Sequence, residues 1–344
     1  GKNKKWHTLL ALHTVQPARV TDGNNDGFMD LPRLTRYMAY NKWHYGNEAE
    51  NGFSMQAGLR ATTEQRVGGH NDAGHNEGST TTYEQCIHYV QPEGYVKARW
   101  RFSPTHVLAL SVVGQQQRQQ AWFGATRYTA QQQYAWLNVQ HEWQWHAQHQ
   151  LRYGISYRYQ HLAEEVAFTG PTLGRTYAGN YNTHLSVPGA FAENTFRWMS
   201  DKLNLITGLR IDQHQQWGTY TTPRAMLKYV ATPRHTLRAS GGTGWRQVFL
   251  FPEQVNLLAS SRNVVFEEPL KPEQALNWGV SHVYRLNGRV LSGTIATDFY
   301  STRFHNQFFP DYDTDPTKAI IRNFTGPSNS HALQVDANLV LLRM

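Results

Sequence analysis

An alternation of apolar and polar side chains recurs along this 344-residue chain, and it limits the possible folds more than any other feature. From 151 to 160, Leu, Tyr, Ile, Tyr and Tyr occupy every second position, and Arg, Gly, Ser, Arg and Gln lie between them. Successive side chains of a β-strand point to opposite faces, so such a segment has one apolar and one polar face. The pattern returns at 95–102, 203–212, 291–300 and 333–339. The sequence therefore predicts an all-β fold.

The connections between these strands are expected to alternate in length. Gly, Asn, Pro and Ser indicate short turns at 46–47, 103–105, 147–148, 200–202, 232–233 and 287–288. Longer connections are expected at 15–34, 67–91, 118–131, 161–186, 214–221, 245–274 and 304–318, with a partly helical stretch at 252–260. This division predicts about fourteen strands paired as hairpins, with every short turn on one rim. Transmembrane β-barrels have this asymmetry, with short periplasmic turns and long extracellular loops.

Large aromatic residues lie just ahead of the expected short turns. They are Trp100, Phe102, Trp143, Trp145, Phe196, Trp198, Tyr229 and Tyr284. Trp and Tyr prefer the membrane–water interface, where an apolar ring and a polar tip are both satisfied. Charged residues make up only 17% of the chain, below the roughly 25% usual in soluble domains. We therefore expect an antiparallel β-barrel in the bacterial outer membrane.

The alternation also assigns faces to individual residues. The arginines expected to face the lumen are Arg99, Arg101, Arg152, Arg158 and Arg210, and the residues expected to face lipid include Ile155 and Leu205. The net charge is +8, and Lys and Arg are scattered along the chain. Nucleic-acid binding usually needs a clustered basic patch, so the scatter favours a cationic lumen or contact with lipopolysaccharide.

Signatures of catalysis are missing from the sequence. Neither Gly-x-Ser-x-Gly nor His-Glu-x-x-His occurs, and Cys86 is the only cysteine, so it has no partner for an internal disulfide. We therefore expect no enzyme.

Two motifs around a strand–loop–strand junction carry a family resemblance. Gly242-Thr243-Gly244-Trp245-Arg246, followed by Leu-Phe-Pro-Glu at 250–253, resembles the Gly-x-Gly-aromatic-Arg motif of TonB-dependent receptors. Leu-Lys-Pro-Glu at 270–273 is similar to the stretch that leads into the next strand in that family. The segment 25–32, Asn-Asp-Gly-Phe-Met-Asp-Leu-Pro, resembles receptors of this kind from Bacteroidetes.

The resemblance implies a particular architecture and activity. Barrels of this family have about twenty-two strands closed around a plug. Residues 1–344 are therefore interpreted as a single barrel domain and a fragment, without the N-terminal plug, the TonB box and the C-terminal strands. The implied activity is binding of a metal chelate, a ferric siderophore or a corrinoid. TonB–ExbB–ExbD would energise its import through the plug. A passive porin-like or adhesin-type barrel and a soluble all-β binding module are the alternatives.

Ligand contacts are expected from aromatic and basic residues of the outer loops, because flat chelates stack on aromatic rings and anionic ones pair with Arg. These candidates are Trp122, Phe123, Arg127, Tyr128, Trp217, Trp245 and Arg246. A role in the outer aromatic girdle is the alternative for Trp122, Phe123 and Trp217.

A possible calcium site lies at 22–30. Its ligands would be the side chains of Asp22, Asn24, Asp26 and Asp30 and the carbonyl of Phe28. Oxygens at positions 1, 3 and 5 with Gly27 at position 6 match the first part of a calcium loop, but Arg33 stands where a bidentate Glu is expected. A polar surface turn is the alternative.

A second group of potential metal ligands occurs in a Gly-rich loop. It consists of His70, Asp72, His75 and Glu77. These residue types bind metals or metal complexes, and a polar loop on a histidine-rich chain is the alternative.

Overall fold

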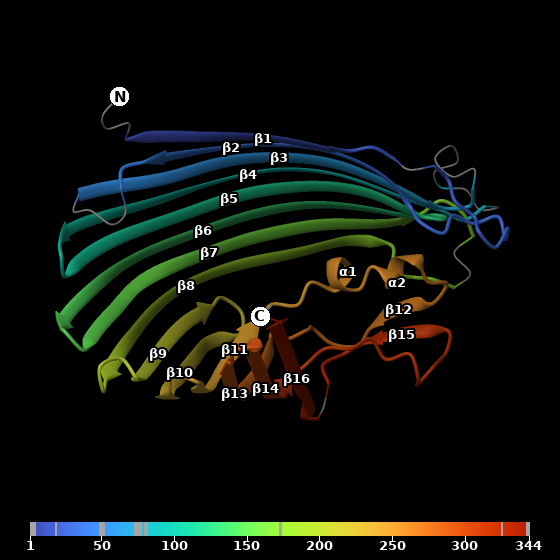
Figure 1. The fold of residues 1–344 in the computed structure, drawn as a ribbon. Coiled ribbons are helices and arrows are strands. Elements are labelled where there is room, and N and C mark those ends of the chain that lie inside the picture. The colour runs from blue at the N-terminus through green and yellow to red at the C-terminus, as the bar shows by residue number, and fades with distance from the viewer. Residues whose placement is uncertain are drawn as a thin grey trace.

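The computed structural model describes residues 5–17, 19–47, 52–71, 78, 82–171, 174–324 and 326–341. Within them, fourteen strands form one antiparallel sheet, arranged in chain order from β1 to β16 (Figure 1). The sheet curves strongly and is open, with β1 at one edge and β16 at the other. The expected fold class and strand number are confirmed.

The strands differ greatly in length. The first eight are β1 (Trp6–Val15), β2 (Arg33–Tyr45), β3 (Gly52–Gly69), β4 (Glu84–Ser103), β5 (His106–Phe123), β6 (Thr126–His146), β7 (His149–Phe168) and β8 (Gly179–Trp198). The others in this sheet are β9 (Leu203–His214), β10 (Gly218–Thr232), β11 (His235–Arg246), β13 (Glu273–Asn287), β14 (Leu291–Asn306) and β16 (Ser328–Leu341).

A folded inner segment lies on the concave side of the sheet (Figure 1). It contains the one-turn helices α1 (Leu250–Glu253) and α2 (Asn256–Ala259), which agree with the expected helical stretch, and strand β12 (Asn263–Phe266). β12 pairs in parallel with β15 (Lys318–Ile321). No helix in the described part of the chain is long and apolar enough to cross a membrane.

Buried apolar side chains attach the inner segment to the sheet. Phe251, Leu257 and Leu258 are buried, and they belong to one cluster with Tyr128 of β6 and Val166 of β7. We call the sheet face that carries this cluster the inner face and the opposite one the outer face. Burial of these side chains explains why the segment stays folded against the sheet, since each contributes about 1.5–3 kcal/mol.

The alternation in sequence separates the two faces as expected. Ile155 of β7 lies on the outer face with 62% of its surface exposed. Arg152 lies on the inner face, where its guanidinium is 3.5 Å from Glu142 and 3.6 Å from Glu193. Exposed aliphatic residues on one face and paired charges on the other are typical of a sheet with lipid outside and water inside.

Ion pairs on the inner face connect five strands. Glu142 forms ion pairs with Arg99 (3.9 Å) and Arg152 (3.5 Å), and Glu193 forms ion pairs with Arg152 (3.6 Å) and Arg224 (2.6 Å). This ion-pair ladder runs from β4 through β6, β7 and β8 to β10. Charges of opposite sign therefore alternate across the inner face.

The predictions of long connections at 118–131 and 214–221 are wrong. β5 and β6 run through 118–131 and are joined by Gly124 and Ala125 alone, with Gly124 at a φ of 56° that suits a tight turn. Residues 214–221 likewise hold only a three-residue turn between β9 and β10. The Gln-rich stretches 115–120 and 131–133 resemble loops because both of their faces are polar, whereas the residues next to the turn bury Ala121, Phe123, Tyr128 and Ala130 under α1. Beyond a membrane both faces of a strand meet water, so alternation disappears although backbone pairing continues.

Candidate ligand-binding site

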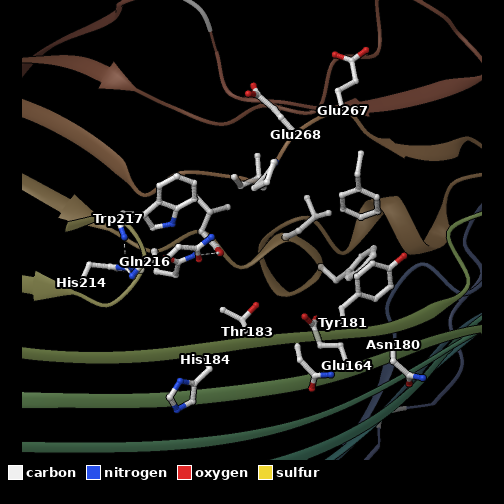
Figure 2. A pocket seen from close by; sticks show the side chains of 18 residues that line it. Glu164, Asn180, Tyr181, Thr183, His184, His214, Gln216, Trp217, Glu267 and Glu268 are labelled. Atoms are coloured by element: carbon white, nitrogen blue, oxygen red, sulfur yellow. Dashed lines mark hydrogen bonds between the residues drawn. The ribbon is translucent and has the colours of Figure 1, made fainter.

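A cavity of about 650 Å³ lies between β8, the β9–β10 turn and the inner segment (Figure 2). Its polar lining includes Thr183, His214, Gln216 and Gln247; β8 also borders it at Asn180, Asn182 and His184, which alternate with Tyr181 and Thr183 and face the other side of the sheet (Figure 2). Its aromatic lining includes Tyr181, Trp217, Phe251 and Phe266, and its acidic lining is Glu164, Glu267 and Glu268. A mainly neutral, hydrogen-bonding cavity with aromatic walls is suited to a small polar ligand with flat parts.

His214, the last residue of β9, organises one wall of the cavity. It is buried, and its Nδ1 accepts backbone N–H bonds from Gln216 (3.0 Å) and Trp217 (3.1 Å). Two donors on Nδ1 require the proton to be on Nε2, which donates to Oε1 of Gln247 at 3.2 Å. The imidazole therefore fixes both the β9–β10 turn that presents Trp217 and the amide of Gln247.

Trp245 forms the centre of a second group beside His214. Its indole stacks on Tyr220 with ring centroids 4.5 Å apart, and its ring lies 5.8 Å from that of His214. Nε1 donates to Oδ2 of Asp212 at 3.2 Å, and the Arg158 guanidinium lies 4.9 Å from the ring centroid. Stacking, a cation–π contact and a hydrogen bond together hold the indole rigidly.

The carboxylate of Asp212 is held in turn by Arg210. Nε and Nη2 of Arg210 donate to its two oxygens at 2.8 and 2.5 Å, and Nη2 also donates to Ser156 at 2.7 Å. Two parallel bonds between a guanidinium and a carboxylate restrict both partners. Arg158 and Arg210, both expected on the lumen side, therefore support the wall around Trp245.

Comparison with known families identifies this architecture. The family model described as "TonB dependent receptor-like, beta-barrel" matches residues 10–332. The chain belongs to the TonB-dependent receptor family. As a barrel of this family it lies in the bacterial outer membrane. No curated protein matches it by sequence.

Solved TonB-dependent receptors have the same fold at low sequence identity. The siderophore receptor PirA of Pseudomonas aeruginosa is 12% identical with a TM-score of 0.57, over 96% of this chain and 62% of that one. The alcaligin receptor FauA of Bordetella pertussis is 12% identical with a TM-score of 0.63, over 97% and 53%. The iron transporter FrpB of Neisseria meningitidis is 13% identical with a TM-score of 0.65, over 97% and 55%. The chain thus spans between half and two thirds of these receptors.

In this receptor barrel, two of the residues that we expected to contact the ligand lie together at the cavity. Trp217 lines the cavity, and Trp245 borders it through His214. Sequence reasoning missed His214, Tyr181 and Thr183 of β8. A signal existed for His214, because it continues the polar positions 208, 210 and 212 on the lumen-facing side of β9.

Three other candidate ligand-binding residues, Phe123, Tyr128 and Arg246, contact other parts of the chain and do not line the cavity. Phe123 and Tyr128 are 3% and 2% exposed, and both belong to the cluster beneath α1. The Tyr128 hydroxyl donates to Glu164 at 2.6 Å. Arg246 ion-pairs with Glu253 (2.7 Å) and Glu273 (2.6 Å), which ties α1 to the start of β13.

The remaining two candidates lie on the outer face near the loop rim. Trp122 and Arg127 are opposite each other on β5 and β6. Arg127 pairs with Glu165 at 2.9 Å, and Trp122 packs against the buried pair Val67 and Cys86. Neither residue lines the cavity.

The segment 22–30 forms a compact, self-bonded loop at the long-loop rim. Asp22 accepts backbone N–H bonds from Asp26 (3.1 Å) and Gly27 (3.0 Å) and a bond from the Asn71 amide (2.7 Å). The Asn71 amide is the main cause that lowers the pKa of Asp22 below its usual value. Asp26 accepts from Phe28 N–H and Asp30 from Gly23 N–H, both at 2.8 Å.

These bonds stabilise the ionised carboxylates, which would otherwise repel one another. Within the described ranges, no group of three or more His, Cys, Asp or Glu side chains is arranged to hold a metal. Calcium binding by Asp22, Asn24, Asp26, Phe28 and Asp30 stays a prediction.

In the Gly-rich loop only His70 can be placed. Its ring lies edge-on to Phe28 at 5.2 Å, so it packs against the 22–30 loop. Asp72, His75 and Glu77 lie outside the described residues.

Proposed function

We propose that this barrel belongs to a receptor that captures a metal chelate outside the cell and passes it inward by TonB-driven import. The observation that carries the proposal is the cavity on the inner face, closed by the inner segment and walled by Trp217, Tyr181 and Phe251. Siderophore receptors and an iron transporter are among the structures with this fold. A passive channel has no need of a lined ligand cavity inside its barrel.

The charges around the cavity favour a neutral or positively charged chelate. No described residue of its lining is Lys or Arg. The backbone N–H of Asn323, donated at 2.8 Å, lowers the pKa of Glu268, so this carboxylate is ionised at neutral pH. Triply anionic ferric catecholates would be repelled there. Ferric hydroxamates and corrinoids therefore fit the lining better.

Import would follow from events outside this cavity. In the proposed cycle the chelate binds between the cavity wall and the plug, and TonB, energised by ExbB and ExbD, pulls on the plug. A path through the lumen then opens along the ion-pair ladder of the inner face. No covalent step is required.

Binding to the full-length receptor tests the proposal. The probes are a ferric hydroxamate, a ferric catecholate and cobalamin, and the readout is quenching of tryptophan fluorescence. Trp217→Ala should weaken binding of the preferred chelate about two- to tenfold, the value of one aromatic contact. The control is Arg127→Ala, on the outer face, which should leave affinity unchanged.

Replacement of Glu268 tests the charge preference separately. Glu268→Gln should reduce the discrimination against the catecholate by about one order of magnitude or less, because the site is partly open to water. No binding of any of these chelates by the unmodified receptor, together with ligand-independent conductance, would favour a passive channel.

A further inference from the structure

Two histidines on the outer face form a hydrogen-bonded pair near the short-turn rim. His235 begins β11, and His282 lies on the neighbouring strand β13. Their rings are parallel within 3°, with centroids 5.3 Å apart, and Nδ1 of His235 is 3.1 Å from Nε2 of His282. Tyr284 packs on His235 at 4.9 Å. Both histidines are half-buried.

The internal bond leaves one N–H of the pair directed elsewhere. If His282 donates from Nε2, then His235 carries its proton on Nε2. If His235 donates from Nδ1, then His282 carries its proton on Nδ1. In the described part of the chain neither of these outer nitrogens has a hydrogen-bond partner. The pair thus presents one donor and one acceptor at the edge of the bilayer, whichever tautomers are present.

An apolar groove of about 460 Å³ adjoins the pair on the same face. Leu227, Tyr229, Leu237, Val280 and Phe299 line it together with His282. Leu237 and Val280 are among the exposed large apolar residues of the outer face. Because this face meets the hydrocarbon of the membrane, the apolar lining of the groove suits an acyl chain.

Arginines of the short turns lie at the same rim as the polar end of the groove, whereas Arg285 of β13 alternates with Tyr284 and faces the inner side. Arg234 directly precedes His235 in the β10–β11 turn, and its carbonyl accepts the backbone N–H of Arg285 at 2.8 Å. Arg289 lies in the next short turn, between β13 and β14. Within the described part of the chain, neither Arg234 nor Arg289 forms an ion pair. Basic residues at this depth attract anionic lipid headgroups.

We propose that this surface binds one anionic glycerophospholipid of the periplasmic leaflet. One acyl chain occupies the groove, and the phosphate accepts a hydrogen bond from the histidine pair and pairs with Arg234. The inference goes beyond chelate import and depends only on the position of the barrel in the outer membrane.

A second histidine pair in the same barrel provides a matched control. His106 and His141 have the same geometry, with Nδ1 of His106 3.1 Å from Nε2 of His141 and rings 5.2 Å apart. Here Phe102 and Trp143 stack against His106, at 5.5 and 5.8 Å. Nδ1 of His141 is bonded to the Tyr153 hydroxyl at 3.0 Å. Rings and a hydroxyl cover this pair, so we expect no lipid site there.

Native mass spectrometry of the full-length receptor, delipidated in detergent, tests the proposal. The probe is a palmitoyl-oleoyl phosphatidylglycerol, with the matching diacylglycerol as a comparison without phosphate. We expect one retained phospholipid, binding about tenfold weaker in His235→Ala, the loss of one hydrogen bond to a charged group, and unchanged binding in His106→Ala. Val280→Trp, which fills the groove, should also reduce retention. The difference in gel mobility between heated and unheated samples shows whether each variant is folded.

Several outcomes would overturn the site. Equal losses in His235→Ala and His106→Ala would indicate a general effect of the aromatic girdle. Equal retention of diacylglycerol and phosphatidylglycerol would mean that the histidine pair has no role. Retention unaffected by both His235→Ala and Val280→Trp, or co-purified lipopolysaccharide in place of phospholipid, would also contradict it.

Discussion

The inner and outer faces of the same strands are built on opposite principles, although their residues alternate along the chain. Arg152 lies in the ion-pair ladder of the inner face, and Ile155, three residues later, is 62% exposed on the outer face. Around these residues the inner face carries ion pairs, and the outer face carries mainly exposed apolar side chains. The effect of a substitution on stability should therefore depend more on the face that carries the residue than on the residue type.

The largest effect is expected from a charge placed on the outer face. Ile155→Arg should lower the free energy of unfolding by about 2–4 kcal/mol, the cost of Arg near mid-bilayer. Arg152→Gln should cost much less, because water reaches the inner face. Urea unfolding of the receptor in lipid vesicles measures both. Similar costs on the two faces would contradict the assignment of lipid and lumen sides.

An intermediate effect is expected where the inner face has no room for a side chain. A Cβ on Gly189 of β8 would lie 2.2 Å from Oδ1 of Asp212 and 2.8 Å from Nη2 of Arg210. Gly189→Ala should lower the free energy of unfolding by about 1–3 kcal/mol. It should also weaken chelate binding, because Asp212 holds Trp245.

Gly114 of β5 provides the matched control, since a Cβ there meets no atom within 4 Å. Gly114→Ala should leave stability and binding nearly unchanged. If both alanine variants behaved alike, the Arg210–Asp212 pair would not be a rigid part of the wall.

The fold was predictable from sequence because lipid and water impose a period of two on each strand. The same reasoning failed where the solvent is the same on both faces. At 115–120 and 131–133 mostly Gln residues face water on both sides, yet Gln116 pairs with Gln133 and Gln117 with Gln132 in the ladder. Backbone pairing continues there without a side-chain pattern to indicate it.

The site was less predictable because its parts are distant in sequence. Thr183, Trp217, Gln247 and Glu268 come from four separate segments. The curvature of the sheet and the folding of the inner segment bring them together. Trp217 and Trp245 were identified because aromatic residues near loops are informative by type. Thr183 of β8 resembles any other lumen-facing polar residue.

A smaller effect is expected from the ion-pair ladder. Glu193 lies between Arg152 and Arg224, whose side chains are 43% and 66% exposed. A double-mutant cycle of Glu193→Gln and Arg224→Gln should give a coupling of about 0.2–1 kcal/mol, since solvent screens such pairs. A coupling of several kcal/mol would mean that the lumen is much drier than the structure indicates.

The smallest effect is expected at the 22–30 loop, where the fold already satisfies the carboxylates. Asp22 accepts two backbone N–H bonds and the Asn71 amide, so a calcium ion would have to compete with them or use the remaining lone pairs. Calcium binding at this loop is expected to be weak, with a Kd of about 10⁻⁴–10⁻³ M, as in extracellular modules. Calorimetry of the receptor with Ca²⁺ at neutral pH, beside Asp26→Ala, measures this. Heat from the unmodified protein that disappears in Asp26→Ala would support a site; equal heat from both, or none, would identify a polar turn.

The folded-state pKa of Asp22 is lowered, so its contribution to the loop is present at neutral pH and is lost as the pH falls through that pKa. Calcium heat that persisted after such acidification would come from elsewhere in the protein.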